Sequence, residues 1–293
     1  MADTLPQTMQ AMALESYGDA HVLKLCELPR PIPGSNDLLI RVRASSLNPL
    51  DYKVRHDGHG IVRKFPVILG FDASGEVLEV GASVKGFQPG DAVFGLVGGA
   101  RQGANAQFAV LDYRSCALKP QRLNFDEAAA IPVACLTAWE AIVDKMRVQA
   151  GQTVFITGGA GGVGHFAVQI AKLHGARVLT TAGRPQSRDF LQALGADVII
   201  DYKKEDLVKR IMDETQGRGC EACFDCVGGA LFDTVLEVLA LHGQVVNITR
   251  TNSENLFKAL FIKSATLHCE NLGAAGYWDN GPELERIGQK LSQ

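Results

Sequence analysis

Residues 158–188, GGAGGVGHFAVQIAKLHGARVLTTAGRPQSR, decide the fold of this 293-residue chain. The apolar run TVFIT (153–157) precedes them and predicts a buried strand, and helical periodicity over 162–174 follows the glycines. ARVLTT (176–181) then predicts a second strand. Strand, glycine turn, helix and strand in this order predict a βαβ unit, from which parallel sheets are built.

The same alternation continues along the chain. Further strands are predicted at DVIID (197–201), CEACFDCVGG (220–229) and QVVNIT (244–249), and helices at SRDFLQALG (187–195), EDLVKRIMDET (205–215) and LFDTVLEVLALHG (231–243). This alternation predicts a doubly wound parallel sheet. Residues 1 to about 125 contain short strands between turns, for example LLIRVRAS (38–45), and predict an antiparallel β-rich domain. Helical periodicity over 126–146 separates the two patterns, and the fold class is α/β.

The glycines of the turn predict a dinucleotide site. Gly159, Gly161 and Gly164 complete the pattern G-x-G-x-x-G between a strand and a helix, which is the context that this motif requires. Glycine permits the turn, the close approach of a pyrophosphate and tight packing of the helix on the strand. The predicted phosphate-binding residues are Gly159, Ala160, Gly161, Gly162, Val163 and Gly164. A glycine-rich turn without a ligand is the alternative.

The end of the second strand lacks the acid that usually binds the ribose in NAD sites. Ala182 occupies about that position, followed by Gly183 and Arg184, with Arg188 one helical turn later. A carboxylate there would repel a 2′-phosphate, whereas arginine binds phosphate with two parallel hydrogen bonds. We therefore predict NADP(H) as the cofactor, held by Gly183, Arg184 and Arg188. The alternative is that both arginines are solvated surface residues.

Composition excludes several other classes of protein. The net charge is −3 and no basic run is present, so nucleic-acid binding is not expected. No apolar run approaches the roughly 18 residues of a membrane span. Seven cysteines at irregular spacing favour a reducing compartment, and we predict a cytoplasmic location. The sequence leaves open whether an uncleaved import signal is present.

Six segments together resemble the medium-chain dehydrogenase/reductase superfamily. They are SSLNPLDYKVR (45–55), FPVILGFDASGEVLEVG (65–81), QPGDAVFG (88–95), AAAIPVACLTAWEAI (128–142), GGAGGVGHFAVQIAK (158–172) and LGADVIIDY (194–202). The resemblance implies a GroES-like catalytic domain over 1–125, a Rossmann domain over 126–262 and a return segment over 263–293. Family chains run some tens of residues beyond PELERIGQKL (282–291), so the resemblance implies that the return segment is cut short.

The positions that hold catalytic zinc in alcohol dehydrogenases of this superfamily carry other residues here. A Cys, a Gly-His-Glu and a second Cys correspond to Asn48, to Phe71 with Asp72, and to about Val133. Zinc binds thiolates and neutral imidazoles, which these positions do not offer. The four-cysteine lobe would fall within 95–108, which contains no cysteine. The resemblance thus narrows to the zinc-free, zeta-crystallin-like quinone oxidoreductases, whose Asn-Pro-x-Asp motif is present at 48–51, and we predict no metal site.

Two other groups of residues have spacings that occur in metal sites. Cys220, Cys223 and Cys226 follow C-x-x-C-x-x-C, but they lie in a predicted strand, where side chains three apart point to opposite faces. We interpret them as core residues. His56 and His59 lie in a predicted loop without an evident third ligand, and we interpret them as solvated.

The missing zinc ligands restrict the substrate. Hydride transfer to an isolated ketone produces an alkoxide, whose conjugate acid has a pKa near that of water, about 15.7. A hydroquinone anion resembles a phenolate, with a conjugate pKa of about 10. The stabilisation required therefore falls by roughly 7–8 kcal/mol, and donors and positioning can provide much of the rest. We predict NADPH-dependent reduction of a quinone or an α,β-unsaturated carbonyl.

The resemblance implies roles for further residues. Asn48 would lie beside the nicotinamide ribose and the substrate, and Tyr52 is the candidate hydrogen-bond donor to the substrate oxygen, the alternative being a packing aromatic. Thr137 and Tyr202 match family positions near the cofactor. Topology adds Val227, Asn247 and Ile248, because open α/β sheets bind ligands at the carboxyl ends of their strands. A homodimer through the sheet edge is the family expectation.

Two other functions stay open on the sequence. One is an NADPH-binding sensor or structural protein with little catalysis, and the other is a zinc-free alcohol dehydrogenase, which the alkoxide argument disfavours. The natural acceptor is not predictable, because loop side chains line substrate pockets in such folds.

Overall fold

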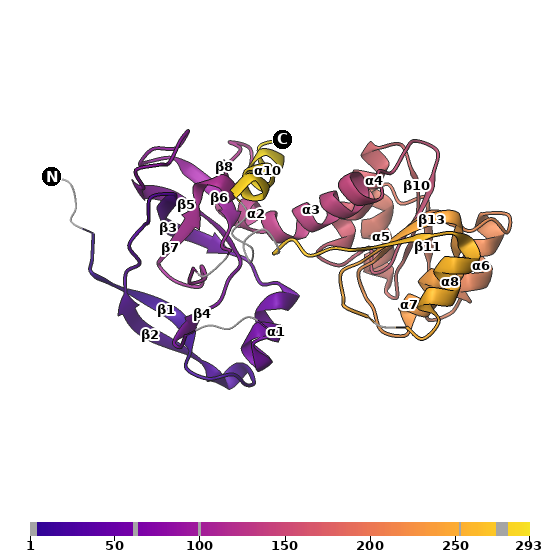
Figure 1. The fold of residues 1–293 in the computed structure, drawn as a ribbon, viewed down its shortest axis with the longest axis horizontal. Coiled ribbons are helices and arrows are strands. Elements are labelled where there is room, and N and C mark those ends of the chain that lie inside the picture. The colour runs from indigo at the N-terminus through magenta and orange to yellow at the C-terminus, as the bar shows by residue number, and fades with distance from the viewer. Residues whose placement is uncertain (1–4, 61–63, 99–100, 252, 274–280) are drawn as a thin grey trace. The chain divides into compact units, whose positions relative to one another are not determined.

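Two compact units make up this computed structural model (Figure 1), which describes residues 5–60, 64–98, 101–251, 253–273 and 281–293. The first contains residues 1–136 and 272–293, and the second contains 137–271. Residues 99–100 of the expected zinc-lobe stretch and residues 274–280 of the expected return segment lie outside the described residues.

The first unit contains two antiparallel sheets. Three strands pair in the order β2 (Leu23–Pro29), β1 (Thr8–Leu14) and β4 (Val67–Ile68). Five strands pair in the order β7 (Phe108–Asp112), β3 (Asp37–Ser45), β5 (Asp72–Val80), β6 (Ala92–Leu96) and β8 (Cys116–Leu118). Alternate side chains of β3 and β5 point into one apolar core, among them Leu38 and Ile40 of β3 and Val77 of β5. The predicted antiparallel β-rich domain is confirmed.

Helices also belong to the described part of this unit. The sequence-based assignment of residues 1–125 to strands and turns missed α1 (Pro49–Asp57), which begins at a proline, a residue favoured in the first turn, and ends at Gly58 in the left-handed region. α2 (Phe125–Ala129) packs on β3 and β5, so the first unit extends beyond residue 125 to Leu136. α10 (Gly281–Leu291, yellow in Figure 1) packs on β8 and on the 3₁₀ turn η2 (Tyr113–Ser115).

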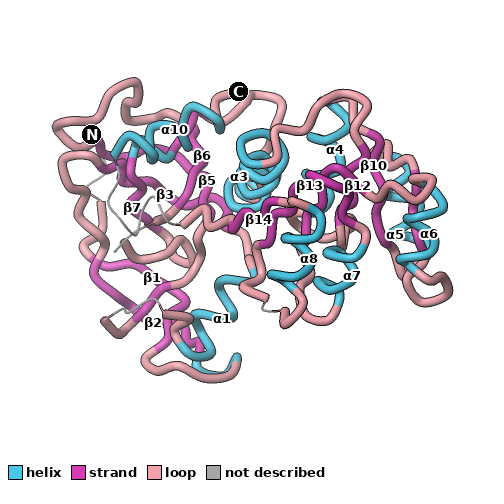
Figure 2. Tube along the Cα trace, turned by 45° about the vertical axis from the view of Figure 1, so that its right-hand side comes forward, coloured by secondary structure: helices cyan, strands magenta, loops and turns pink. Residues whose placement is uncertain are grey.

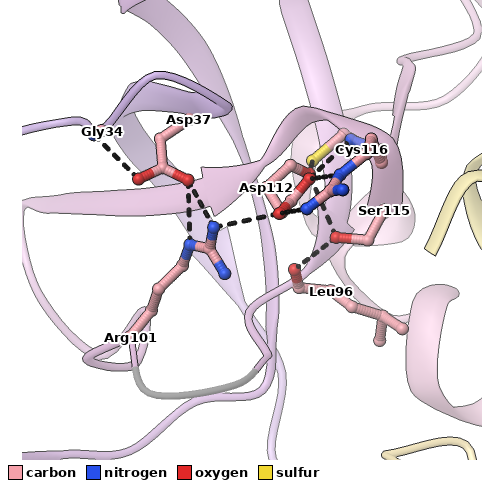
Figure 3. Close-up of polar contacts among 8 residues, drawn as sticks. Gly34, Asp37, Leu96, Arg101, Asp112, Ser115 and Cys116 are labelled. Atoms are coloured by element: carbon pink, nitrogen blue, oxygen red, sulfur yellow. Dashed lines mark hydrogen bonds and ion pairs between the residues drawn. The ribbon is translucent and has the colours of Figure 1, made fainter. Parts of the chain in front are cut away.

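An ion-pair network supports the stretch around Arg101 (Figure 3). The Arg101 guanidinium donates from Nε to Asp37 Oδ1 at 3.0 Å and from Nη2 to Asp112 Oδ2 at 3.0 Å. Arg114 donates from Nε to the other Asp112 oxygen at 2.8 Å. Burial raises the pKa of Asp112, but the hydrogen bonds and charges of Arg114 and Arg101 outweigh it and hold that pKa below its usual value. The network ties the chain after β6 to β3 and β7.

The second unit is built around one parallel sheet. Its strand order is β11 (Val198–Ile200), β10 (Arg177–Thr181), β9 (Thr153–Ile156), β12 (Cys220–Asp225), β13 (Leu239–Asn247) and β14 (Thr266–Cys269). In order of appearance this is 3-2-1-4-5-6, the Rossmann order, so the direction of winding reverses between β9 and β12. The predicted doubly wound sheet is confirmed.

Helices follow these strands. They are α4 (Gly164–Leu173), α5 (Pro185–Ala193), α6 (Leu207–Glu214), α7 (Leu231–Glu237) and α8 (Leu256–Lys263). Figure 2 shows the strands between α4 on one side and α7 and α8 on the other. Thirteen buried residues, among them Phe155, Leu179 and Val245, form a core cluster of this unit. The sheet therefore has apolar residues beneath its helices, as a parallel sheet requires.

The predicted helix over 126–146 is interrupted in the structure. α2 ends at Ala129, and α3 begins at Pro132 and ends at Trp139. A π-helical segment, η3 (Glu140–Lys145), continues from α3. Proline lacks the backbone N–H that would continue α2, and it is well suited to begin a new helix, which explains the break.

Two sequence-based assignments in the second unit are wrong. The helix predicted over 231–243 ends at Glu237, and residues 239–243 instead begin β13, where Leu239 pairs with Cys220. Residues 263–271, expected in the return segment, belong to the second unit, because Thr266–Cys269 pairs with β13. Apolar periodicity alone does not detect such pairing, since the partner strands are distant in sequence.

Cys220 and Cys223 also differ from expectation. Both are completely buried in one core cluster, where Cys220 contributes to the raised pKa of the Cys223 thiol. The prediction that they point to opposite faces is wrong, because the β12–β13 register shifts between residues 220 and 222. Their interpretation as core residues agrees with this burial, which together with the Cys220 contact raises the pKa of Cys223.

Candidate functional site

The predicted phosphate turn connects β9 to α4 at the point where the winding of the sheet reverses. Gly161 donates its N–H to Gly158 O at 2.8 Å, which closes the turn. A Cβ on Gly159 would lie 2.2 Å from Thr180 Oγ1, and one on Gly164 would lie 2.3 Å from Gly158 O. Only glycine fits these two close approaches. The remaining predicted residues are also in this turn: Ala160, Gly161 and Gly162 are exposed, and Val163 is partly exposed.

This turn exposes backbone to a ligand. A Cβ on Gly162 would meet nothing within 4 Å, so the space in front of the turn is open. Val163 precedes the first residue of α4, and the free N–H groups of a helix's first turn attract anions. The residues present therefore fit a pyrophosphate, as the sequence motif predicts.

The residues predicted for the adenosine end follow the strands β10 and β11. Gly183 is against Tyr202, because a Cβ on Gly183 would lie 2.6 Å from the Tyr202 hydroxyl oxygen. Ala182 is buried, whereas Arg184 and Arg188 are exposed at the start of α5. One Arg188 nitrogen, Nη2, donates to Ile199 O at 2.8 Å. Arg188 is thus partly anchored by the backbone of β11, which favours one direction for its side chain.

A buried aspartate that the sequence analysis did not select organises the ends of β12 and β13. Asp225 Oδ1 accepts from Thr157 Oγ1 at 2.9 Å and from Gly228 N at 3.0 Å, and its Oδ2 accepts from Asn247 Nδ2 at 2.8 Å. Asn247 is therefore held in place, and Val227 beside it is half exposed. Ile248, partly exposed, donates its N–H to Asp225 O at 3.4 Å. The structure brings Val227, Asn247 and Ile248 together.

Thr137 belongs to the second unit and is buried in α3. The resemblance placed it near the cofactor, and that role stays a prediction.

In the first unit, the residues at the three zinc-ligand positions come together around the carboxylate of Asp72. Asp72 Oδ2 accepts from Asn48 Nδ2 at 2.7 Å and also from the Ser46 hydroxyl. Its Oδ1 accepts from the backbone N–H of Val133 at 2.8 Å. Asp72 is only 1% exposed, and burial raises its pKa to about 6 despite these three hydrogen bonds. Asn48, Asp72 and Val133 therefore form a hydrogen-bonded set.

The start of α1 places Asn48 and Tyr52. Asp51 Oδ2 accepts from the backbone N–H of Asn48 at 2.8 Å, and its Oδ1 accepts from Gly70 N at 2.8 Å. Asp51 thereby links α1 to the chain just before β5. Tyr52 is 54% exposed, so its ring is not part of the core. Much of the Tyr52 side chain is therefore at the surface of this unit.

These side chains do not fit the zinc of the alcohol dehydrogenases. An amide, an aromatic ring and an aliphatic side chain replace the sulfur and imidazole ligands, and Asp72 is occupied by three donors. Over the described ranges, no group of three or more His, Cys, Asp or Glu residues could hold a metal ion. The same ranges contain no helix that is both long and apolar enough to cross a membrane.

From the sequence, Asp72 was assigned only to a position without a zinc ligand, and Ser46 and Asp225 had no predicted role. The signal for both aspartates was weak but present. Asp72 begins a strand in which its neighbours are buried, and Asp225 ends an apolar strand. An acid next to a buried strand must find donors, since an unpaired buried carboxylate is costly.

Comparisons with known proteins agree with these two units. The family model described as an alcohol dehydrogenase GroES-like domain matches residues 34–121, and that described as a zinc-binding dehydrogenase matches residues 162–283. A chloroplast envelope quinone oxidoreductase homolog from Arabidopsis thaliana is 36% identical over 252 residues, which cover 82% of this chain and 75% of the relative.

Solved structures of related proteins have the same fold. An alcohol dehydrogenase superfamily protein from Novosphingobium aromaticivorans has a TM-score of 0.89 at 37% identity, with 97% of this chain and 84% of the other covered. A mycobacterial protein complexed with NADPH has a TM-score of 0.85 at 28% identity, with 97% and 87% covered.

Proposed function

This chain is an oxidoreductase of the medium-chain dehydrogenase/reductase superfamily, and we propose that it uses NADPH to reduce a quinone or an α,β-unsaturated carbonyl without a metal ion. The Arabidopsis relative named as a quinone oxidoreductase homolog supports the quinone as acceptor, and the mycobacterial structure with NADPH supports the cofactor.

One observation carries the metal-free part of this proposal. Asn48 and Val133, at two of the zinc-ligand positions, both donate hydrogen bonds to the carboxylate of Asp72 at the third. An aliphatic side chain and an amide do not provide the thiolates and imidazole that zinc prefers. The single carboxylate would have to give up three donors in order to bind a cation. We infer that these positions organise the protein instead of binding a metal.

Without a Lewis acid, the acceptor itself must carry the negative charge that hydride transfer creates. An isolated ketone would become an alkoxide, with a conjugate pKa of about 15.7. A quinone or an enone spreads the charge over a conjugated system, and a hydroquinone has a pKa of about 10. The difference is roughly 7–8 kcal/mol of stabilisation that the protein does not have to provide.

The second unit supports NADPH as the cofactor, which supplies a hydride from nicotinamide C4 when bound. Gly164 lets the start of α4 lie against the backbone of Gly158, and Gly159 lets the turn lie against the side chain of Thr180, an arrangement that suits a pyrophosphate. Gly183 and the exposed Arg184 and Arg188 would hold a 2′-phosphate, since no carboxylate stands at the end of β10. Tyr202 would border the adenosine end, and Thr137, Val227, Asn247 and Ile248 would line the rest.

Two residues of the first unit would contact the reacting groups. The half-exposed Tyr52 would donate a hydrogen bond from its hydroxyl to the acceptor oxygen, where negative charge develops. Asn48 would bind a ribose hydroxyl of the cofactor, with its amide held by Asp72. Asp51, whose oxygens hold backbone N–H groups, would keep the start of α1 in place and transfer no proton.

An acceptor panel tests this proposal. The purified protein is assayed for NADPH oxidation with 9,10-phenanthrenequinone, an enal and a simple ketone, and each assay is repeated with NADH. We expect turnover of the quinone or the enal and a preference for NADPH. Turnover of the ketone alone would indicate the alcohol dehydrogenase alternative. NADPH binding without turnover of any acceptor would indicate a sensor or structural protein.

We further propose a cytoplasmic homodimer formed through the edge of the parallel sheet. β14 is an edge strand, and the neighbouring helix α8 exposes Phe257, Phe261 and Ile262. An exposed strand edge beside an apolar patch favours pairing with a second copy. Sedimentation of the wild type and of a Phe261→Glu variant measures this, and an unchanged sedimentation coefficient would contradict it.

A further inference from the structure

We infer that Asp72 is a positioning residue that fixes which way the Asn48 side-chain amide faces. This inference rests on the proposed function, in which Asn48 contacts the cofactor, and extends it to a residue that touches no ligand. An asparagine amide can rotate by 180° and exchange its donor and acceptor at little cost in shape. A site that uses such an amide therefore needs a partner that accepts only one of the two orientations.

Asp72 meets this requirement. An ionised carboxylate only accepts hydrogen bonds, so the group 2.7 Å from Asp72 Oδ2 must be the NH₂ of Asn48 and not its carbonyl. Ser46 adds to this preference, because its hydroxyl donates to Asp72 and thus offers only its lone pairs to Asn48 Nδ2, 3.1 Å away. The reversed amide would bring its carbonyl oxygen against two oxygen atoms.

Asp72 and Ser46 occupy only one side of the amide nitrogen. They are hydrogen-bonded to each other, so both lie in the direction of a single N–H of Asn48. The second N–H and the carbonyl Oδ1 are therefore oriented away from Asp72 in a fixed order. A ligand hydroxyl beside Asn48 meets one pattern of donor and acceptor instead of two. This preorganisation saves the ligand the cost of selecting an orientation.

The other oxygen of Asp72 keeps the carboxylate itself in place. Oδ1 accepts from the N–H of Val133, which is in the first turn of α3, where backbone N–H groups lack partners within the helix. A negative charge is favourable at this end of a helix. The carboxylate is thus fixed at both oxygens, which a single amide or hydroxyl in its place could not reproduce.

Asp72→Asn is the informative variant, because it keeps the size of the side chain. Asparagine has one accepting oxygen, so it cannot accept from both Val133 and Asn48. When its oxygen faces Val133, its NH₂ faces Asn48 and favours the reversed amide. Asp112→Asn is the matched control, since Asp112 is a buried aspartate of the same unit, 4% exposed, whose carboxylate binds Arg101 and Arg114 instead of Asn48.

The first measurement requires no ligand. The protein is labelled with ¹⁵N-asparagine, and the Asn48 NH₂ signals are assigned by their loss in Asn48→Ala. We expect two separate signals that exchange slowly with water in the wild type and in Asp112→Asn. In Asp72→Asn they should shift and exchange faster. Unchanged Asn48 signals in Asp72→Asn would overturn the inference.

The second measurement is a double-mutant cycle on NADPH affinity, followed by nicotinamide fluorescence. We expect Asp72→Asn and Asn48→Ala each to weaken binding about ten- to a hundredfold, the cost of a hydrogen bond lost from a prearranged site. The double variant should bind no more weakly than Asn48→Ala, because Asp72 acts through Asn48. Additive losses would overturn the inference.

The two measurements separate this inference from the proposed function. If the wild type binds NADPH but reduces no acceptor, the proposed reaction fails while the cycle still decides the role of Asp72. If the wild type does not bind NADPH, the proposed cofactor is wrong, and the NMR comparison alone decides whether Asp72 orients Asn48.

Discussion

Replacing Glu270 by glutamine should make the protein more stable at pH 8 and leave its stability near pH 4.5 unchanged. Glu270 follows β14, and its side chain is only 1% exposed. Lys145 Nζ lies 3.2 Å from its Oε2. Burial raises the pKa of Glu270 most, the charge of Glu140 adds to the rise, and Lys145 opposes it, so that the pKa is about 7.

The size of the effect follows from this pKa. A carboxyl whose pKa changes from its ordinary 4.5 to about 7 favours the protonated form in the folded state by roughly 3 kcal/mol. Because the folded pKa is raised, this stability is fully present below pH 4.5 and is lost as the pH rises through 7. Glutamine carries no charge at any pH. Because Glu270→Gln also removes the ion pair with Lys145, we expect a net gain of about 1–3 kcal/mol at pH 8.

Thermal unfolding of both proteins between pH 4.5 and 8 measures this. A gain of this size corresponds to an increase in Tm of a few degrees. Glu237→Gln is the matched control, because it makes the same change at an exposed position of the same unit and should alter stability by less than about 0.5 kcal/mol. Equal pH dependence in wild type and Glu270→Gln, or a less stable variant at pH 8, would refute the reasoning.

Three further predictions concern the second unit. Arg184→Glu/Arg188→Glu should weaken NADPH binding by a factor of ten or more and spare NADH, as measured by fluorescence titration; unchanged NADPH affinity would contradict the 2′-phosphate assignment. Gly164→Ala, whose Cβ would lie 2.3 Å from Gly158 O, should cost about 1–3 kcal/mol in denaturant unfolding, whereas Gly162→Ala, with nothing within 4 Å, should not. Asp197→Asn should lower the Tm at pH 7. Burial alone would raise the pKa of Asp197, but hydrogen bonds from Lys172 and from the Val178 N–H hold that pKa below its usual value. The stability that these hydrogen bonds provide is therefore lost as the pH falls below 3.8. A difference from wild type that does not become smaller as the pH falls from 7 to 2 would contradict that prediction.

The parts of the fold that depend on local patterns were predictable. The strand–glycine–helix–strand pattern over 153–181 corresponds to β9, α4 and β10. These elements were predictable because each has its own apolar periodicity and because the glycines mark a phosphate-binding turn. α1 was missed, since its short amphipathic stretch has weak periodicity and is recognised in the structure by its proline start and glycine end. The common face of Cys220 and Cys223 was missed because a register shift is a property of two paired strands.

The candidate site also has features that the sequence predicts and features that only the structure reveals. By itself the sequence determined the phosphate turn, the missing acid after β10 and the lack of zinc ligands, because each depends on residue types at fixed short spacings. Only the tertiary structure decided what replaces the zinc ligands. Asn48 and Val133 are 24 and 61 positions from Asp72, and they meet only because α1, β5 and the start of α3 converge there. A buried carboxylate must find donors, and folding determines which ones reach it.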